Sequence, residues 1–312
     1  MTPLVSVIIP CFNAERWVGE AIGSALSQTY RQLEIIVIDD GSTDRSLEIV
    51  KSFGEQIRWE SGPNRGANVA RNRGFALSKG KYIQFLDADD YLLPEKIARQ
   101  VAFLESTDAD VVYGDWQHQH HRQNGKVELE EIAVSDNHED VLGALFGGWW
   151  VAPAAVLSKR EAIVRTGGWD PSLAAAQDRD YMISLALAGA RILYQPGCYS
   201  VYRRYGAVTV STGNRQRWLE NHTRVLDKAL STLESTGRLT AKYRNALARS
   251  YFALAQNYYD YDRTAFGQLI AKVLRLEPKF SVSHSRFYAL AQKLLGLHTA
   301  EALANWTRKV RR

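Results

Sequence analysis

The chain has 312 residues, of which 46% are hydrophobic, 23% charged and 11% aromatic. This composition is typical of globular proteins and argues against a disordered chain, a collagen-like repeat and a disulfide scaffold. The formal charge of +5 is too small and too dispersed to indicate nucleic-acid binding. The two cysteines, Cys11 and Cys198, fit a reducing compartment, with a single disulfide as the alternative.

We expect neither a targeting segment nor a membrane span. Residues 1–11 have no basic lead and no small-residue cleavage site. The longest uncharged stretch, residues 141–158, approaches the length that crosses a bilayer, but it contains three glycines and Pro153. We therefore predict buried loop and strand for this stretch and a cytoplasmic location for the protein.

The first half of the chain alternates between two apolar patterns. Short β-branched runs predict buried strands, and apolar residues spaced every three or four positions predict helices. In chain order we expect a strand at 5–9, a helix carrying Val18, Ile22 and Leu26 that Asn13 caps, a strand at 34–38, a helix carrying Leu47, Val50 and Phe53, a helix through 70–74, a strand at 81–86 and a short strand at 111–113. This alternation indicates an α/β fold, with a mostly parallel sheet and helices on both faces.

From about Asn214 the chain lacks strand-like runs and is rich in Ala, Leu, Arg and Tyr at helical spacing. Residues 246–278 resemble a single tetratricopeptide-like helix pair, which cannot bury both of its faces alone. We therefore expect a helical appendage at 214–312 after a first domain at 1–213. The basic tail at 308–312 suggests peripheral attachment to the inner face of a membrane through the helical C-terminus.

Acidic residues follow two of the predicted strands. Asp39 and Asp40 end one strand, and Asp87 and Asp89 come directly after another. Ligands of open α/β sheets bind at the carboxyl ends of the strands. Two carboxylates spaced like Asp87 and Asp89 can bind a hard divalent cation and leave positions for phosphate oxygens. Asp90 has the alternative of capping the helix that begins near Pro94.

These segments, together with others downstream, resemble the inverting family 2 glycosyltransferases of the GT-A type. The matching segments are residues 5–13, 38–44, 64–66 with 70–72, 85–90, 167–170 and 178–180. The resemblance covers about residues 1–210. It implies a GT-A (nucleotide-diphospho-sugar transferase) fold with a mixed, mostly parallel sheet and helices on both faces, to which the C-terminal all-helical appendage is added.

The resemblance implies that the first acidic turn holds the base and ribose of a nucleotide. Asp39 is the residue we expect in contact, whereas Asp40 either joins it or only shapes the turn. Arg71 either meets the nucleotide and its diphosphate or pairs with Asp39 or Asp87. The remaining nucleotide-binding positions carried over from the family pattern are Pro10, Phe12, Asn13 and Asn64.

The second acidic turn is implied to hold the metal. Asp89 would be the ligand of Mg²⁺ or Mn²⁺, and Asp87 would contact ribose or the water shell of the metal. The catalytic base implied by the family pattern is Asp178, which also has the alternative role of a helix cap. The family usually has Glu-Asp here, so Gln177 is a departure. A family Tyr-Arg-x-His segment is matched by residues 202–205, in which Arg203 or Arg204 supplies the charge and no His is present.

The predicted function is metal-dependent transfer of one sugar, with inversion, from a nucleoside-diphosphate sugar, UDP-sugar favoured, to a carbohydrate or glycolipid acceptor of cell-surface biosynthesis. Processive members carry Gln-x-x-Arg-Trp, whereas Asn214 stands where that Gln would precede Arg217-Trp218. The alternatives are a sugar nucleotidyltransferase, which the loop at 10–14 disfavours because it has no glycine, and a non-catalytic scaffolding relative. Residues 118–121 are predicted to form an exposed loop. The pair Trp149-Trp150 either packs in the core or stacks on an acceptor sugar.

Overall fold

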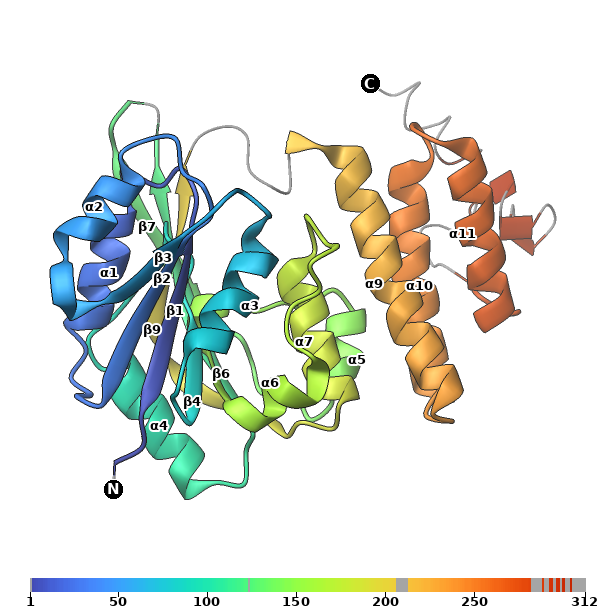
Figure 1. Cartoon of the computed structure of the whole chain (residues 1–312). Helices are drawn as coiled ribbons and strands as arrows, with labels where there is room; N and C mark the ends of the chain where they lie inside the picture. The colour runs from blue at the N-terminus through green and yellow to red at the C-terminus, as the bar shows by residue number, and fades with distance from the viewer. Residues whose placement is uncertain are drawn as a thin grey trace. The chain divides into compact units, whose positions relative to one another are not determined.

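The computed structural model describes residues 2–122, 124–205 and 213–281, together with residues 288, 292–293, 296–297, 299–300 and 304 (Figure 1). The chain divides into two compact units. The first comprises Met1–Leu142 and Trp150–Gly213, and the second comprises Gly143–Trp149 and Asn214–Arg312. Residues 143–149 thus group with the C-terminal helices, whereas we expected one division between 213 and 214. The basic tail at 308–312 lies outside the described residues.

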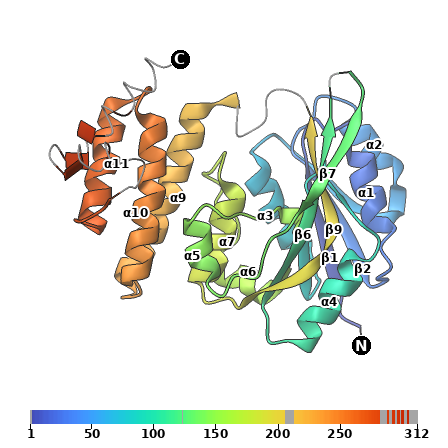
Figure 2. The ribbon, with the colours of Figure 1, turned by 180° about the vertical axis from the view of Figure 1, so that it is seen from behind.

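The first unit is built around one mixed sheet, which Figures 1 and 2 show from opposite sides. Within the described residues this sheet has nine strands, in the order β3-β2-β1-β4-β8-β6-β9-β5 with β7 paired to β6. The strands are β1 (Val5–Cys11), β2 (Leu33–Asp39), β3 (Arg58–Ser61), β4 (Tyr82–Phe85), β5 (Tyr91–Leu92), β6 (Val111–His121), β7 (Val127–Ala133), β8 (Val156–Lys159) and β9 (Ile192–Tyr205).

Most of the sheet is parallel. β3, β2, β1 and β4 run in one direction, and β9 runs parallel to β6. β8 lies antiparallel between β4 and β6, and β5 and β7 are antiparallel to β9 and β6. The predicted fold class is confirmed. Because β2, β1 and β4 are adjacent and parallel, the segments that follow them leave the sheet at the same edge.

Helices cover both faces of the sheet (Figures 1 and 2). The face that carries Val7 and Ile9 of β1 packs against α1 (Val18–Leu26), α2 (Ser46–Ser52) and α4 (Lys96–Ser106). Ile36 and Ile38 of β2 point to the other face and pack against α3 (Ala67–Leu77), while α6 (Arg160–Thr166) and α7 (Gln177–Leu187) lie further along. This division follows from the alternation of side chains along each strand. Two short 3₁₀ turns complete the unit, η1 (Gly54–Gln56) and η2 (Pro153–Ala155).

In the second half of this unit two sequence-based expectations were wrong, and one predicted strand was correct but too short. Residues 118–121 are not a loop, because they form the end of β6, paired with β7 on one side and β9 on the other. The strand predicted at 111–113 is therefore much longer. The stretch 141–158 contains helix α5 (Val141–Phe146) before η2 and β8, so only its second part is strand.

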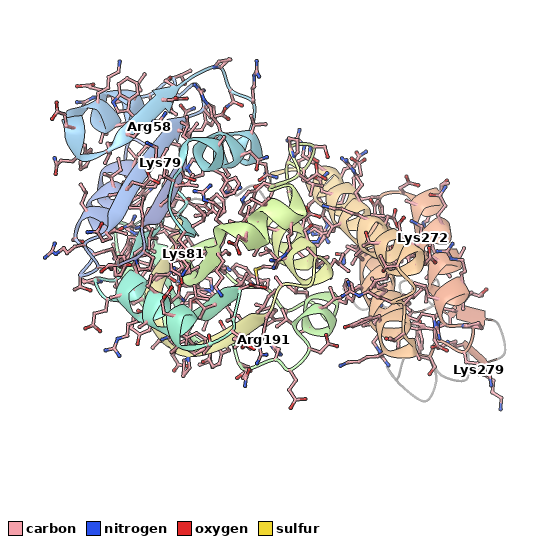
Figure 3. All side chains as sticks on the ribbon, turned by 60° about the horizontal axis from the view of Figure 1, so that its bottom comes forward. Arg58, Lys79, Lys81, Arg191, Lys272 and Lys279 are labelled. Atoms are coloured by element: carbon pink, nitrogen blue, oxygen red, sulfur yellow. The ribbon has the colours of Figure 1, made fainter. Side chains whose placement is uncertain are left out.

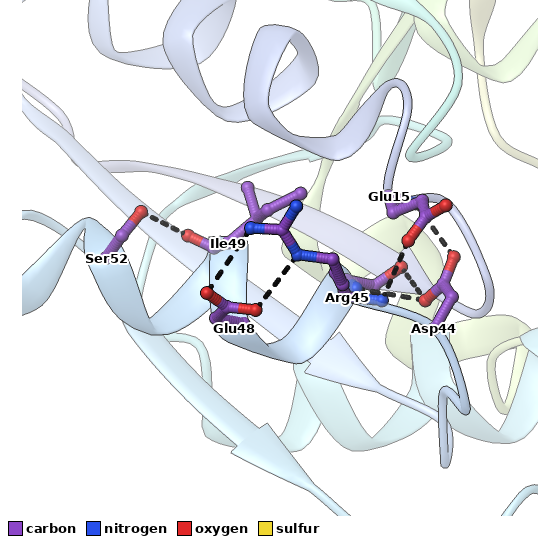
Figure 4. A network of polar contacts seen from close by, with 7 residues as sticks. Glu15, Asp44, Arg45, Glu48, Ile49 and Ser52 are labelled. Carbon is purple, nitrogen blue, oxygen red and sulfur yellow. Dashed lines mark hydrogen bonds and ion pairs between the residues drawn. The ribbon is translucent and has the colours of Figure 1, made fainter.

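The loops after β1 and β2 are tied together by polar contacts (Figure 4). The backbone amide of Glu15 donates to Oδ2 of Asp44 (3.0 Å), and the amide of Arg45 donates to Oε2 of Glu15 (3.0 Å). Asn13 joins them by accepting from the amide of Thr43 (2.8 Å). We had expected Asn13 to cap α1. It does not, because that helix begins at Val18, and no side chain caps its first turn.

The second unit is helical where the structure describes it. Its main helices are α9 (Arg215–Ser235), α10 (Ala241–Tyr258) and α11 (Arg263–Leu276). Asp262 caps α11 by accepting from the amides of Thr264 (2.8 Å) and Ala265 (3.0 Å). α10 and α11 form the helix pair expected from the spacing of apolar residues in this region.

Basic side chains belong to many different elements, as the labelled residues of Figure 3 illustrate. Lys81 pairs with Glu105 (2.7 Å), Arg191 with Asp108 (2.5 Å) and, in the second unit, Lys272 with Asp227 (2.5 Å). Such exposed pairs contribute little to stability, typically below about 1 kcal/mol each. Among the described residues, no helix combines the length and the apolar character needed to cross a membrane.

Candidate active site

The first acidic turn lies at the end of β2. Asp39 pairs in register with Cys11 of β1 and is 1% exposed. Its carboxylate accepts hydrogen bonds from the hydroxyl of Ser61 (2.6 Å) and the amide of Ser42 (3.3 Å). The backbone carbonyl of Asp39 also accepts from the amide of Gly62 (3.1 Å), so the loop before α3 is held against this turn.

The carboxylate of Asp40 binds the backbone of that same loop before α3. One carboxylate oxygen accepts from the amide of Arg65 (2.8 Å) and the other from the amide of Gly66 (2.8 Å), immediately before α3. Both oxygens of Asp40 are therefore engaged with the backbone, which matches the turn-shaping alternative given above. Two backbone amides at the start of a helix are ordinary partners for a carboxylate.

The other positions at this end of the sheet differ in exposure. Pro10 is buried within β1, whereas Phe12, 48% exposed, follows the strand. Asn13 has a φ of +49° and, as described above, bonds to the loop after β2. Asn64 is exposed in the loop that Asp40 holds. Phe12 and Asn64 are thus open to solvent, while Pro10 and Asn13 shape the surrounding backbone.

Arg71 connects α3 to the second acidic turn. This buried guanidinium donates to Oδ1 of Asp87 (2.6 Å), to Asn68 (2.9 Å) and to the amide oxygen of Gln177 (3.2 Å). Burial alone would lower the pKa of Arg71, but the carboxylates of Asp87 and Asp178 outweigh it and raise the pKa. Of the alternatives for Arg71, the structure shows the pair with Asp87.

Trp169 completes the setting of Arg71, and sequence reasoning gave it no role of its own. The guanidinium lies 4.4 Å from the centre of the Trp169 ring, and this ring also stacks on Tyr181 at 4.3 Å. Asn72 donates to the carbonyl of Trp169 (2.7 Å) and accepts from its amide (2.9 Å). At Gly168, φ is +88° and a Cβ would lie 2.6 Å from Oδ1 of Asn72, so a glycine is required. The segments 64–72 and 167–170 therefore pack directly against each other.

Asp89 and Asp90 form the rest of the second acidic turn. Oδ2 of Asp89 accepts from the hydroxyl of Tyr205 (3.1 Å). Burial and the neighbouring Asp87 raise the pKa of Asp89 to about 6. Asp90 is 1% exposed, and one of its carboxylate oxygens accepts from the amide of Arg203 (2.9 Å). The backbone amide of Asp90 donates to the carbonyl of Asp87 (3.0 Å). Asp90 therefore supports the turn rather than capping α4.

The guanidinium of Arg203 is held by several protein groups. Its guanidinium donates to Gln119 (3.0 Å) and to the carbonyl of Asp89 (3.1 Å), and it pairs with Glu20 (2.5 Å). The side chain of Arg203 is 1% exposed, whereas its neighbour Arg204 is exposed. Of the two arginines that we considered for phosphate binding, Arg203 thus holds the acidic turn, and Arg204 is the one open to solvent.

Asp178 stands in the first turn of α7, next to Gln177. It is not the N-cap residue, because that position is taken by Ala176, which has a φ of +59°. Burial raises the pKa of Asp178 to about 6, although the nearby guanidinium of Arg71 lowers it and Asp87 adds to the rise. A carboxylate of this kind is largely ionised at neutral pH and basic enough to accept a proton.

The structure therefore brings the predicted residues together in two groups. In the first group Arg71 bonds to Asp87 and interacts electrostatically with Asp178, and Asp89 belongs to the same turn as Asp87. The second group consists of Asp39, Asp40 and Asn13. Since β2 and β4 flank β1, the two turns are separated by about two strand spacings, roughly 10 Å. That separation suits a ligand that reaches from a nucleoside to a diphosphate. Tyr205 and Trp169 are the contributors that sequence reasoning missed.

Comparison with known proteins gives a family. Residues 6–140 match the model of "Glycosyl transferase family 2". An uncharacterized glycosyltransferase of Haemophilus influenzae is 36% identical over 118 residues, which are 36% of this chain and 47% of that protein. Glycosyltransferase GlyG of Streptococcus pneumoniae is 27% identical over 253 residues, which are 74% of this chain and 81% of that protein.

Two solved structures share the fold. S. aureus TarS 1-349 in complex with UDP-GlcNAc superposes with a TM-score of 0.71 at 20% identity, over 97% of this chain and 92% of that one. The mannosyltransferase PcManGT from Pyrobaculum calidifontis, in complex with GDP-Man and Mn²⁺, gives a TM-score of 0.56 at 19% identity, over 98% of this chain and 88% of that one.

The match to the Haemophilus influenzae protein spans less than half of that relative's length. Both acidic turns, and the strands β2 and β4 that precede them, lie within the matched residues 6–140. The fold of the two solved structures is the GT-A fold expected from the sequence. Residues 6–140, which include both acidic turns, thus match glycosyl transferase family 2.

Proposed function

We propose that the chain transfers a single sugar from a nucleoside-diphosphate sugar to a hydroxyl group of a carbohydrate or glycolipid, with inversion and with help from a divalent cation. The observation that carries this proposal is the contact of Arg71 with Asp87 at 2.6 Å, with Asp178 acting on the same guanidinium. It gathers the carboxylates of two distant sequence segments at the edge of the sheet where ligands of α/β folds bind.

In this proposal the first acidic turn binds the nucleoside. Asp39 keeps lone pairs for a ribose hydroxyl or a base N–H beside its bond to Ser61, and the exposed ring of Phe12 offers a surface for the base. Pro10, Asn13 and Asp40 act indirectly by holding the loops, and Asn64 lies exposed in the loop that Asp40 fixes.

The second acidic turn suits a divalent cation. Asp89 offers a hard oxygen ligand. Burial raises its pKa, and so does the negative charge of Asp87, which a bound cation would offset. Among the described residues, no group of three or more His, Cys, Asp or Glu side chains is arranged to hold a metal. Asp89 would therefore bind Mg²⁺ or Mn²⁺ jointly with the oxygens of the donor diphosphate. Bound there, the cation would neutralise charge on the departing nucleoside diphosphate.

Asp178 is proposed as the base. It would take the proton from the attacking hydroxyl as that oxygen approaches the anomeric carbon on the side opposite the leaving group, so that configuration inverts. General-base assistance of this kind contributes about 10²–10⁴ in rate. Asp87 and Arg71 would orient the donor beside it, and the exposed Arg204 would provide positive charge for the diphosphate, with Arg203 as the support of the turn.

The similar structures support the donor class. TarS was solved with UDP-GlcNAc and with UDP, and PcManGT with GDP-Man and Mn²⁺. We favour a UDP-sugar because TarS gives the higher TM-score. Cell-surface polysaccharide or glycolipid biosynthesis, and attachment to a membrane through residues 308–312, stay predictions from the sequence.

The test is a calorimetric binding panel of UDP, GDP, TDP and CDP, each with and without Mn²⁺. We expect one nucleotide to bind wild-type protein more tightly with Mn²⁺, and Asp89→Ala to lose that gain. Asp108→Ala removes an exposed carboxylate of an ion pair elsewhere and should behave as wild type. If no nucleotide binds, or if Asp89→Ala keeps the metal-dependent gain, the assignment of this turn is wrong.

A second measurement separates binding from chemistry. Asp178→Asn should bind the same nucleotide as tightly as wild type while transfer falls by about 10²–10⁴. Transfer by this variant at near wild-type rate would remove Asp178 as the base. Wild-type protein that binds nucleotide yet releases no nucleoside diphosphate from any donor would favour the scaffolding alternative.

A further inference from the structure

Four aromatic side chains gather where β6 and β9 run side by side. His118 pairs in register with Tyr202, and their rings lie 5.4 Å apart, edge to face. Trp150, which precedes η2, lies 5.9 Å from the ring of Tyr202 and 5.1 Å from that of Trp116. All four belong to the first unit. Trp116 is 5% exposed and forms the floor of this aromatic cluster, whereas the other three remain partly exposed.

The aromatic cluster adjoins the acidic turn and Asp178. Tyr202 precedes Arg203, whose amide bonds to Asp90 and whose guanidinium bonds to the carbonyl of Asp89. Burial raises the pKa of Tyr202, and the carboxylates of Asp90, Asp87 and Asp178 raise it further, so its hydroxyl lies within their electrostatic reach. A ligand lying on Tyr202 would thus lie close to the second acidic turn.

His118 adds a directed polar group to the cluster. The indole N–H of Trp116 donates to Nε2 of His118 (3.4 Å). An indole nitrogen only donates, so Nε2 accepts and the proton of the neutral ring sits on Nδ1. Burial and the positive charge of Arg204 lower the pKa of His118, which favours this neutral form. Nδ1 is buried and has no hydrogen-bond partner among the described residues. An unpaired buried donor is unfavourable, and a hydrogen bond to a ligand oxygen would satisfy it.

We propose that Trp150, Tyr202 and His118 form the binding site for a sugar ring of the acceptor, resting on the function proposed above. The partly exposed rings of Trp150 and Tyr202 offer the apolar surface on which the C–H face of a pyranose packs, and Nδ1 of His118 donates to one of its oxygens. Binding sites of this kind combine aromatic walls with a few directed polar groups. The acceptor is therefore a glycoside or an oligosaccharide end, rather than a bare lipid or a protein hydroxyl.

The site also explains an aromatic pair that the sequence left between two explanations. Trp150 contacts Tyr202 and Trp116 in the first unit, while its neighbour Trp149 belongs to the second unit. We assign the sugar contact to Trp150, because its ring contacts Tyr202 and Trp116. The core-packing explanation, in contrast, predicts that truncation at Trp150 changes stability without changing ligand affinity.

The test uses full-length protein saturated with UDP and Mn²⁺, titrated with p-nitrophenyl glycosides of glucose, galactose, mannose, N-acetylglucosamine and N-acetylgalactosamine. Saturation-transfer NMR reports which glycoside binds and through which ring protons. We expect at least one glycoside to bind, Trp150→Ala to weaken it at least tenfold, and His118→Ala to weaken it severalfold. The dissociation constant of UDP should stay within twofold of the wild-type value in both variants.

Two further variants control for folding. Trp150→Phe keeps an aromatic face and should recover most of the affinity, and Trp218→Ala removes a partly exposed ring that packs on His222 and should change nothing. The inference is overturned if no glycoside binds a protein that binds UDP, or if Trp150→Ala binds the glycoside as tightly as wild type. Failure of wild-type protein to bind UDP would overturn the function proposed above, and this inference with it.

Discussion

The amide oxygen of Gln177 accepts a hydrogen bond from Arg71 at 3.2 Å, next to the bond that Arg71 donates to Asp87 at 2.6 Å. A neutral side chain thus stands where the family pattern has a glutamate. Gln177 also donates to the carbonyl of Leu173 (3.0 Å), so the amide is used at both ends. Gln177 therefore adds no charge, and the negative charges that act on the guanidinium are those of Asp87, Asp178 and Asp89.

Gln177→Glu should therefore make Asp178 harder to ionise. The new carboxylate would share Arg71 and add a like charge beside the base, and both effects raise the pKa of Asp178. We expect the acidic limb of the pH profile of kcat/KM to move upward by about one pH unit. Gln177→Met, which has a similar size and no charge, should leave the limb in place. A limb that moves equally in both variants would mean that shape rather than charge is responsible.

The wild-type pH dependence follows from the same carboxylate. Because burial raises the pKa of Asp178 to about 6, kcat/KM should fall as pH drops through 6, and the decrease should approach tenfold per pH unit below it. Steady-state rates at fixed Mn²⁺ and saturating donor measure this. An activity that stays flat down to pH 5 would contradict the assignment of the base.

Stability should depend on pH in the opposite sense. A folded-state pKa above the ordinary value of 3.8 means that ionised Asp178 destabilises the native state, so stability is lost as pH rises through about 6. Asp178→Asn carries no such charge. Its Tm should exceed that of wild type at pH 8, and the two should converge at pH 4, which thermal unfolding followed by circular dichroism can measure.

Tyr205 is predicted to support the metal ligand. Its hydroxyl donates to Oδ2 of Asp89 (3.1 Å), while its ring packs 5.2 Å from Trp17. Groups that orient a metal ligand typically contribute about 10–100-fold to metal affinity. Tyr205→Phe keeps the ring and should weaken Mn²⁺ binding in the presence of UDP by about tenfold, as measured by electron paramagnetic resonance of free Mn²⁺. Tyr261→Phe, at an exposed tyrosine of the second unit, is the control. Unchanged affinity would show that Asp89 needs no help from this hydroxyl.

The sequence predicted the parts of the fold whose signal is local. Val5–Ile9 and Glu34–Ile38 are β-branched runs long enough to be recognised as buried strands, and both lie within observed strands, β1 and β2. The polar end of β6 carried no such signal. His118 and His120 are in a strand because β7 and β9 pair with it on either side, which is a long-range cause.

The candidate site shows the same limit. Sequence patterns pointed to Asp87, Arg71 and Asp178, but they left the partner of Arg71 open between a nucleotide, Asp39 and Asp87. The engagement of Arg203 with Glu20 and the contact of Arg71 with Trp169 join residues far apart in the chain, and no spacing rule connects them. Asn13 is a similar case, since its preferred local role as a helix cap is replaced by a bond to Thr43 of another loop.

Two helix glycines give a final, matched prediction about how α3 is placed. In α3, a Cβ at Gly74 would lie 2.4 Å from Cγ2 of Ile8 in β1, so this glycine lets the helix approach the sheet and brings Arg71 near Asp87. Gly74→Ala should lower the free energy of unfolding by about 1–3 kcal/mol. A Cβ at Gly23 of α1 meets nothing within 4 Å, so Gly23→Ala should raise the free energy of unfolding by about 0.5–1 kcal/mol. Urea unfolding of both variants measures this difference in sign, and a Gly74→Ala protein as stable as wild type would show that the helix can move away from the sheet at little cost.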